Sequence, residues 1–471
     1  MHLYRQLAHV VLAFSVVLAT ALSTVTAVAA DLDARIGQLL DSVPRGGDAG
    51  VAVYDLGVNT WLSRHDADKP LSLASTTKAL VGAAALSQLG QGFVFRTQVW
   101  SIGPLGQRLG GLGIVGGGDP CLDGHFSDDE PDRFFTDWAQ KLRQQGVQAI
   151  DGDLVIDNRL FSGPDKPTTY PKDQENQQRW YSAPASAFAW NDNCIEVRVM
   201  PTRVGERAEV QVRPLSARIT VVNKVRTVAG KGDKAIFVTR DADSNSVTLT
   251  GNYAQATPWF PLSIHDDPDL LAGDHLKAIL QRNGIPVAGQ VRIGPLATQG
   301  GRLLIDHTSP LVPAVSLMLK NSQNFYGEQI LRILGFERSR EGSIEAGATA
   351  TKTILRRIIG AHVDQITILD GSGLSYGNSA SAEAMVDMLV AMHRSPLRDA
   401  FYDSLKERNL GKLQGRVKTG TLAIATCLVG YIDTPGGRRR AFAILLNKGS
   451  ARNLDWAPKL RDSLYRAISD D

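Results

Sequence analysis

Hydrophobic and polar positions follow two different periods along this chain. Near the N-terminus, Gly50–Tyr54 and Thr60–Leu62 have the composition of two strands separated by turn residues, so we expect a hairpin. The alanine-rich run Ala79–Leu89 then predicts a mostly apolar helix, and Gly90 is a typical residue at which a helix ends.

Short alternating segments dominate the middle of the chain. Ala208–Arg213 and Ser246–Thr250 alternate between apolar and polar residues, which is typical of half-buried strands. We therefore expect residues 91–289 to form a β-rich region, most simply as two subdomains. Its glycine run at Gly116–Gly118 is not a phosphate-binding loop, because no Gly-Lys-Ser/Thr follows it.

The last third of the chain has the same mixture of predicted helices and strands as the first part. The helices that we expect here span Ala314–Lys320, Phe325–Leu334 and Ser343–Ile359. Strands are expected within Gly415–Asp433 and at Arg440–Asn447, with Pro435-Gly436-Gly437 turning between them as an antiparallel hairpin. Both ends thus share an α/β pattern. We expect residues 30–90 and 290–471 to form one domain, with residues 91–289 inserted into it.

Composition narrows the class of protein. The 471 residues are 43% hydrophobic and 21% charged, which is ordinary for a globular protein and argues against disorder. The net charge is only +3, and no basic stripe is visible, so a nucleic-acid partner is not expected.

The N-terminus has the form of a secretory signal peptide. His2 and Arg5 precede the uncharged stretch Val10–Leu22, and Ala27-Val28-Ala29 has the small-x-small pattern of a cleavage site. A permanent membrane anchor is the alternative, but serines and threonines interrupt the apolar run. We expect residues 1–29 to be removed and the product to be exported, to the periplasm or the outer face of the wall, without a membrane anchor.

The cysteines leave the redox state open. Cys121 and Cys194 could form a disulfide, since export permits one, or all three cysteines including Cys427 could be separate buried thiols. No His/Cys cluster has the spacing of a zinc site, so we expect no metal or other cofactor.

Two residues just before the alanine-rich run suggest nucleophilic chemistry, and we expect Ser75 in the first turn of that helix. Ser75 and Lys78 lie three positions apart, which places both side chains on one face of a helix. Serine is a weak nucleophile until a neighbour accepts its proton, and lysine can do so when burial or nearby positive charge lowers its pKa. Taken alone, this spacing is often accidental.

Two further motifs indicate that the Ser75–Lys78 pair is not accidental. Ser322-Gln323-Asn324 is the only Ser-x-Asn and lies at a polar break between two predicted helices, and Lys418-Thr419-Gly420 is the only Lys-Thr-Gly and lies on a predicted strand. Each alone has a structural explanation, a helix break and a strand edge. Together and in this order they match the set found in β-lactamases and penicillin-binding proteins, with Gln323 in place of the usual aspartate.

The spacing of the motifs indicates the family. Ser75 and Ser322 are 247 residues apart (322 − 75), and Ser322 and Lys418 are 96 apart (418 − 322). A simple β-lactamase has a much shorter first interval. The chain resembles the class C low-molecular-mass penicillin-binding proteins, the D-alanyl-D-alanine carboxypeptidase/endopeptidase family that includes penicillin-binding protein 4. Gly117–Pro120, Tyr181–Pro184 and Asp370–Ser375 also resemble segments of that family, and we interpret them as structural.

The resemblance implies a fold and a set of roles. The fold would be a penicillin-binding/β-lactamase-like α/β domain, an antiparallel sheet flanked by helices, with inserted β-rich domains. The substrates would be peptidoglycan stem peptides, and β-lactam antibiotics would acylate the same serine. The catalytic residues would be Ser75, Lys78 and Ser322, and the substrate-binding residues Asn324, Lys418, Thr419, Gly420 and Thr421. We expect both carboxypeptidase and endopeptidase activity.

Two other functions remain as alternatives. A class A β-lactamase needs a glutamate on a loop in a Glu-x-x-Leu-Asn pattern, whereas the nearest segment, Glu328–Arg332, ends in arginine and lies in a predicted helix. A non-catalytic wall-binding or β-lactam-sensing module would be acylated without releasing D-alanine.

Overall fold

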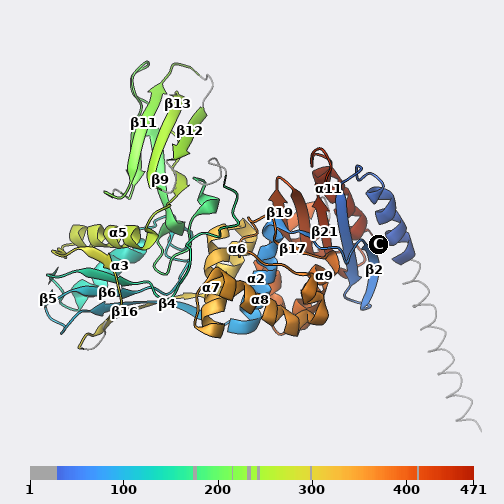
Figure 1. Cartoon of the computed structure of the whole chain (residues 1–471), viewed down its shortest axis with the longest axis horizontal. Helices are drawn as coiled ribbons and strands as arrows, with labels where there is room; N and C mark the ends of the chain where they lie inside the picture. The colour runs from blue at the N-terminus through green and yellow to red at the C-terminus, as the bar shows by residue number, and fades with distance from the viewer. Residues whose placement is uncertain are drawn as a thin grey trace, which may run out of the picture. The chain divides into compact units, whose positions relative to one another are not determined.

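A computed structural model describes residues 29–172, 178–214, 216–230, 235–240, 244–296, 300–410 and 413–470 of the chain (Figure 1). The predicted signal peptide lies outside the described residues except for Ala29. Among the described residues, no helix is both long and apolar enough to cross a membrane. The structure has two compact units, which are described separately. The first contains residues up to Ala83, Lys352–Ile368 and Tyr376–Asp471, and the second contains Ala84–Thr351 and Leu369–Ser375.

The first unit is built on one antiparallel six-stranded sheet. Its strand order is β18-β19-β20-β21-β1-β2. These strands are β1 (Asp48–Asp55), β2 (Thr60–His65), β18 (Lys406–Leu410), β19 (Leu413–Leu422), β20 (Ala425–Asp433) and β21 (Arg439–Asn447). A small ladder joins β3 (Leu71–Ser72) and β17 (Ser379–Ala380). The hairpins predicted at β1–β2 and at β20–β21 are confirmed.

Helices cover both faces of this sheet (Figure 1). A helix over residues 29–40 and α11 (Ala457–Ser469) pack on one face, where Ile36, Leu464 and Ile468 meet sheet residues such as Phe442 and Ile444 in a common apolar core. The other face packs against α9 (Ala382–Arg394) and the 3-10 turn η1 (Ala74–Thr76). The remaining elements are α10 (Arg398–Ser404) and η5 (Gly360–Gln365). Two helices have residues in both units, α2 (Thr77–Leu89) and α8 (Ile344–Ile359).

The described residues of the second unit form three sheets of at least three strands each. The largest has the order β15-β8-β6-β4-β16, and two three-stranded sheets have the orders β10-β9-β14 and β11-β13-β12. The first sheet comprises β4 (Val94–Ser101), β6 (Leu112–Val115), β8 (Leu154–Asp157), β15 (Val291–Ile293) and β16 (Leu303–Pro310). The other two comprise β9 (Cys194–Met200), β10 (Glu209–Arg213), β11 (Thr220–Thr227), β12 (Ala235–Arg240), β13 (Ser246–Tyr253) and β14 (Phe260–Ser263). A short ladder joins β5 (Arg108–Leu109) and β7 (Ala149–Ile150).

The helices of this unit include two that the sequence analysis did not anticipate. They are α3 (Arg133–Gln144) and α5 (Pro268–Arg282), which pack on the five-stranded sheet through a core containing Trp138, Leu142 and Leu276. The unit also contains α6 (Leu311–Asn321), α7 (Asn324–Ser339) and the 3-10 turns η2 (Gly124–Phe126), η3 (Trp180–Ser182) and η4 (Asn191–Asn193). The helix break predicted between α6 and α7 is confirmed.

The second unit extends beyond residue 289, because β16 pairs with β4. The predicted domain limits of 30–90, 91–289 and 290–471 stay a prediction. A buried carboxylate, Asp269, lies in the first turn of α5. It accepts hydrogen bonds from the backbone N–H of Phe188 (2.7 Å) and from Asn158 Nδ2 (3.1 Å). Burial raises the pKa of Asp269 to about 6.

Candidate active site

Ser75 lies in a tight turn directly before α2. The turn is the 3-10 turn η1, so Ser75 precedes the α-helix instead of lying in its first turn as expected. The hydroxyl groups of Thr76 and Thr77 donate to the carbonyls of Leu73 (2.6 Å) and Ala74 (2.9 Å) and hold the turn together. Ser75 remains partly exposed while its neighbours on both sides are buried, which leaves its hydroxyl accessible.

Lys78 lies one turn further along and is completely buried. Its Nζ is 3.1 Å from Oγ of Ser75, within the range for proton transfer between the two groups. The i, i+3 spacing therefore brings the amine and the hydroxyl together as the sequence predicted.

Strand β19 passes close against the Ser75 turn. A Cβ atom on Gly420 would lie 2.6 Å from the carbonyl oxygen of Leu73 and 3.1 Å from the backbone N of Thr76. Gly420 is one of the predicted substrate-binding residues. In this unit the close neighbour is the turn itself, so the glycine sets the distance between the Lys-Thr-Gly strand and Ser75.

Lys418 on the same strand is buried, with 1% of its surface exposed. Its Nζ donates to the carbonyl of Thr419 (2.7 Å). Burial, with the positive charge of Lys78 as a smaller cause, lowers the pKa of Lys418 well below its ordinary value. Thr421, two positions beyond Thr419, is exposed.

One edge of β19 is open beside these residues. Within the part of the chain that the structure describes, β18 pairs with β19 only as far as Val417. From Lys418 to Leu422 the strand pairs with β20 on its other side alone. A strand edge that pairs with no other strand can bind an extended peptide through backbone hydrogen bonds.

The second motif forms the turn between α6 and α7 in the second unit. Ser322 has φ 59° and ψ 34°, a left-handed conformation that costs a non-glycine residue roughly 1 kcal/mol. Gln323 then caps α7, and Asn324 begins it. Asn324 Nδ2 donates to the carbonyl of Tyr181 in η3 (2.8 Å), which ties the motif to the Tyr181–Pro184 segment.

A buried glutamate holds the backbone of the Asp370–Ser375 loop. This contact is consistent with a structural role for the loop. Glu328 on α7 accepts hydrogen bonds from the backbone N–H of Gly371 (3.1 Å) and Ser372 (2.9 Å) and from the hydroxyl of Tyr170 (2.9 Å). Burial, then the charge of Asp370, raises the pKa of Glu328 to about 7.

The glycine run Gly116–Gly118 is also structural. A Cβ atom on Gly116 would lie 2.6 Å from the carbonyl carbon of Ala187. The adjoining Asp119 is buried, and its carboxylate accepts from the backbone N–H of Cys121 (2.9 Å) and the hydroxyl of Ser309 (2.5 Å).

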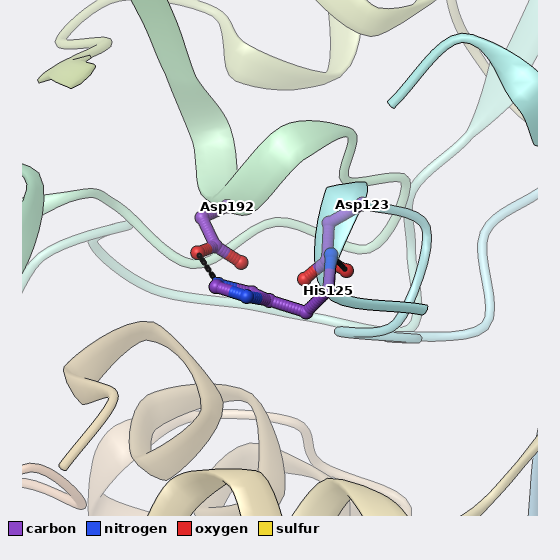
Figure 2. Close-up of side chains that lie close together, drawn as sticks. All are labelled: Asp123, His125 and Asp192. Atoms are coloured by element: carbon purple, nitrogen blue, oxygen red, sulfur yellow. Dashed lines mark hydrogen bonds and ion pairs between the residues drawn. The ribbon is translucent and has the colours of Figure 1, made fainter. Parts of the chain in front are cut away.

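Sequence reasoning missed a group of polar side chains in the second unit. Asp123, His125 and Asp192 lie side by side, with His125 Nε2 3.4 Å from Asp192 Oδ2 (Figure 2). The hydrogen bond to Asp192 is the main cause that raises the pKa of His125 to about 9. Gln323 Nε2 lies 2.9 Å from His125 Nε2, so a neutral imidazole accepts from Gln323, whereas a protonated one donates to Asp192. Asp192 is distant in sequence, and only the fold brings it to His125.

The geometry of the first unit defines a class of protein. An antiparallel sheet flanked by helices, with a Ser-x-x-Lys turn against a Lys-Thr-Gly strand, is the fold of penicillin-binding proteins and β-lactamases. The chain belongs to the D-Ala-D-Ala carboxypeptidase 3 (S13) family, whose model matches residues 30–460. The predicted family and fold class are thereby confirmed.

Individual relatives agree with this assignment. A D-alanyl-D-alanine carboxypeptidase of Actinomadura sp. (strain R39) is 29% identical over 447 residues, covering 88% of this chain and 80% of the relative. The D-alanyl-D-alanine carboxypeptidase DacB of Haemophilus influenzae is 25% identical over 444 residues, covering 89% and 90%. The crystal structure of penicillin-binding protein 4 from Haemophilus influenzae shares the fold, with a TM-score of 0.75 at 23% identity over 93% of this chain and 99% of that one.

Proposed function

We propose that this chain is a serine-type DD-peptidase that cleaves D-Ala–D-Ala termini of peptidoglycan stem peptides through an acyl-enzyme. The observation that carries the proposal is the 3.1 Å contact between the buried Lys78 amine and the Ser75 hydroxyl, in a turn fixed against the Lys-Thr-Gly strand. A serine with a basic group within hydrogen-bonding reach is the usual arrangement of an activated nucleophile.

In this proposal the residues act in the following sequence. Ser75 Oγ attacks the carbonyl carbon of the scissile bond while its proton passes to the neutral Lys78 amine. Backbone N–H groups of Ser75 and Thr421 would stabilise the oxyanion. The C–N bond then breaks, and Ser322 relays a proton to the leaving amine. Water hydrolyses the ester and restores the Ser75 hydroxyl.

The substrate lies along the open edge of β19 in this proposal. The exposed Thr421 and the neighbouring Thr419 hydroxyl bind the terminal carboxylate, and Lys418 supplies positive potential. Because burial disfavours the charge of Lys418, arrival of a carboxylate raises its pKa again. Binding is therefore coupled to proton uptake at Lys418. Asn324 orients the amide of the substrate.

The same site would also cleave D-Ala–diamino acid cross-links and would react with β-lactams. Both reactions need only a D-alanyl carbonyl, or its β-lactam equivalent, placed before Ser75. Removal of residues 1–29 and export, to the periplasm or the cell-wall face, would bring the enzyme to this substrate.

The first test is covalent labelling of the mature protein with a fluorescent penicillin. Wild type should be labelled and Ser75→Ala should not. Ser87→Ala is the matched control, since Ser87 is an exposed serine on α2, the helix that follows the Ser75 turn. This variant should be labelled at the wild-type rate. Equal labelling of Ser75→Ala and wild type would refute the assignment of the nucleophile. Lys78→Ala should be acylated at least about 100-fold more slowly if it is the base.

Product analysis separates the possible activities. Release of D-alanine from a pentapeptide supports the carboxypeptidase, and conversion of cross-linked dimers to monomers supports the endopeptidase. Rapid turnover of a chromogenic cephalosporin would instead favour a β-lactamase. Glu328 argues against that alternative, because its carboxylate already holds the Gly371–Ser372 backbone. Labelling without any D-alanine release would indicate a sensor.

A further inference from the structure

Three side chains of metal-ligand type converge in the second unit. One ligand atom from each of Asp123, His125 and Asp192 lies within 4.8 Å of the other two (Figure 2). Asp123 and His125 come from the turn at η2, and Asp192 comes from η4. In Figure 2 the imidazole of His125 extends toward the Asp192 carboxylate, with Asp123 beside it.

The Asp123 carboxylate is oriented by its neighbours and still has capacity to bind. Its Oδ1 accepts from the backbone N–H of His125 (2.8 Å), and its Oδ2 accepts from the hydroxyl of Tyr326. Each carboxylate oxygen has two lone pairs, so one remains on each. Metal-binding carboxylates are commonly held by such outer partners.

Gln323 supplies a second, independent observation. Its side chain is only 7% exposed, and its amide faces His125 and the Asp192 carboxylate, at 2.9 and 3.5 Å from Nε2. Among the described residues, Gln323 Oε1 and Asp192 Oδ1 are buried and have no hydrogen-bond partner. A buried oxygen without a hydrogen-bond partner destabilises the fold. A simple His125–Asp192 ion pair leaves both of these oxygens unsatisfied.

A cation has a route to this cluster. A cavity of about 350 Å³ is lined by His125, Asp192 and Gln323, together with Asp129 and the Glu196–Arg213 ion pair. Because Arg213 balances the charge of Glu196, Asp129 and Asp192 are the carboxylates of this lining that favour a cation.

We propose that Asp123, His125 and Asp192 bind one divalent transition-metal cation. A flip of the Gln323 amide would replace Nε2, which faces these residues, by Oε1 and so supply a fourth ligand. One imidazole and two carboxylates form a ligand set used by zinc. Ligand atoms of a tetrahedral zinc ion lie about 3.3 Å apart, given bonds of about 2.0 Å. The 3.4 Å between His125 and Asp192 already fits, whereas the other pairs, which lie within 4.8 Å, would have to close when the ion binds.

The bound cation would stabilise the second motif. Gln323 lies between Ser322 and Asn324, so the cation would join the α6–α7 turn to η2 and η4. This inference does not depend on the proposed reaction, since binding can be measured without a substrate.

The test is calorimetric titration of the tag-free mature protein, first treated with chelator, with ZnCl₂, MnCl₂ and MgCl₂. We expect one equivalent of Zn²⁺ and weaker Mn²⁺ and Mg²⁺ binding, as the affinity order of divalent ions requires. Asp192→Asn keeps the size of the side chain and should weaken Zn²⁺ binding more than about 100-fold. Tyr326→Phe, which removes an outer partner, should weaken it about 10- to 100-fold.

The matched control is His362→Ala. His362 also pairs with an aspartate, Asp387, but no third ligand joins that pair within the described residues. This variant should bind Zn²⁺ like wild type. No Zn²⁺ uptake by wild type, or undiminished uptake by Asp192→Asn, would overturn the proposal. If Asp192→Asn does not fold, Co²⁺ binding to wild type decides: a visible absorption band that Zn²⁺ displaces supports the site, and its absence refutes it.

Discussion

Replacement of Gly420 by alanine tests whether β19 fixes the position of the nucleophile. The new Cβ would lie 2.6 Å from the Leu73 carbonyl oxygen and 3.1 Å from both Ala74 Cβ and Thr76 N. An ordinary carbon–oxygen contact is about 3.3 Å, so the strand and the turn must separate by about 0.7 Å. All the atoms in contact belong to the backbone or to Cβ, so no flexible side chain can absorb this shift.

Two magnitudes follow from that displacement. Overpacking of this kind costs about 1–3 kcal/mol of folding free energy. A shift of about 1 Å in the reacting groups can cost about 100-fold in rate, so 0.7 Å at Ser75 should slow acylation by about 10- to 100-fold.

The assay is stopped-flow acylation by a fluorescent penicillin, with a thermal melt of the same sample. Gly37→Ala is the control. Gly37 lies in the helix over residues 29–40, and a Cβ there would meet its nearest neighbour, His65 Cε1, at an ordinary 3.5 Å. The Gly37→Ala variant should keep the wild-type acylation rate and gain up to about 1 kcal/mol of folding stability. A Gly420→Ala protein with the wild-type rate and melting temperature would refute the argument from close approach.

Three further predictions concern the second unit. Ser322→Gly removes both the hydroxyl and the left-handed strain of Ser322, so we expect an unchanged or higher melting temperature but acylation slowed by about 100-fold or more; a wild-type rate would remove Ser322 from the proton pathway. Asp269 has a pKa of about 6 in the fold, above about 3.9 in the unfolded chain, so its stabilising effect is complete below pH 3.9 and lost as the pH rises through 6. Urea denaturation should show wild type losing up to about 3 kcal/mol relative to Asp269→Asn between pH 4 and pH 7, and parallel pH curves would contradict this. Tyr170→Phe removes a buried hydrogen bond to Glu328 and should lower the unfolding free energy by about 1–2 kcal/mol, measured by the same method; no loss would mean that the bond contributes nothing net.

Local signals explain what the sequence predicted correctly. Gly436-Gly437 identified the β20–β21 turn, and Gly437 indeed has φ 79°. Gly90, with φ 79°, ends α2 as expected. The three motifs were recognised because each combines rare residue types at a fixed spacing.

What the sequence did not reveal depends on contacts or on weak local signals. The turn between β19 and β20 at Ala423-Ile424 contains no glycine, proline or asparagine, so its hairpin had no local signature. The stripe of Phe135, Trp138 and Leu142 on α3 was overlooked because alternating segments dominate that region. Pairing of β1 with β21, and of His125 with Asp192, joins residues that are far apart in sequence.

Because its three cysteines are buried, the folded chain should react very slowly with thiol reagents. Cys121, Cys194 and Cys427 are free thiols, and burial raises the pKa of each, to about 12 for Cys427. At pH 7 only about one Cys427 in 10⁵ is then a thiolate, the form that reacts. Oxidation or mispairing therefore requires a chain that has not yet folded or that has transiently opened. The rate of cysteine alkylation would measure how often the native protein opens, without any engineered probe.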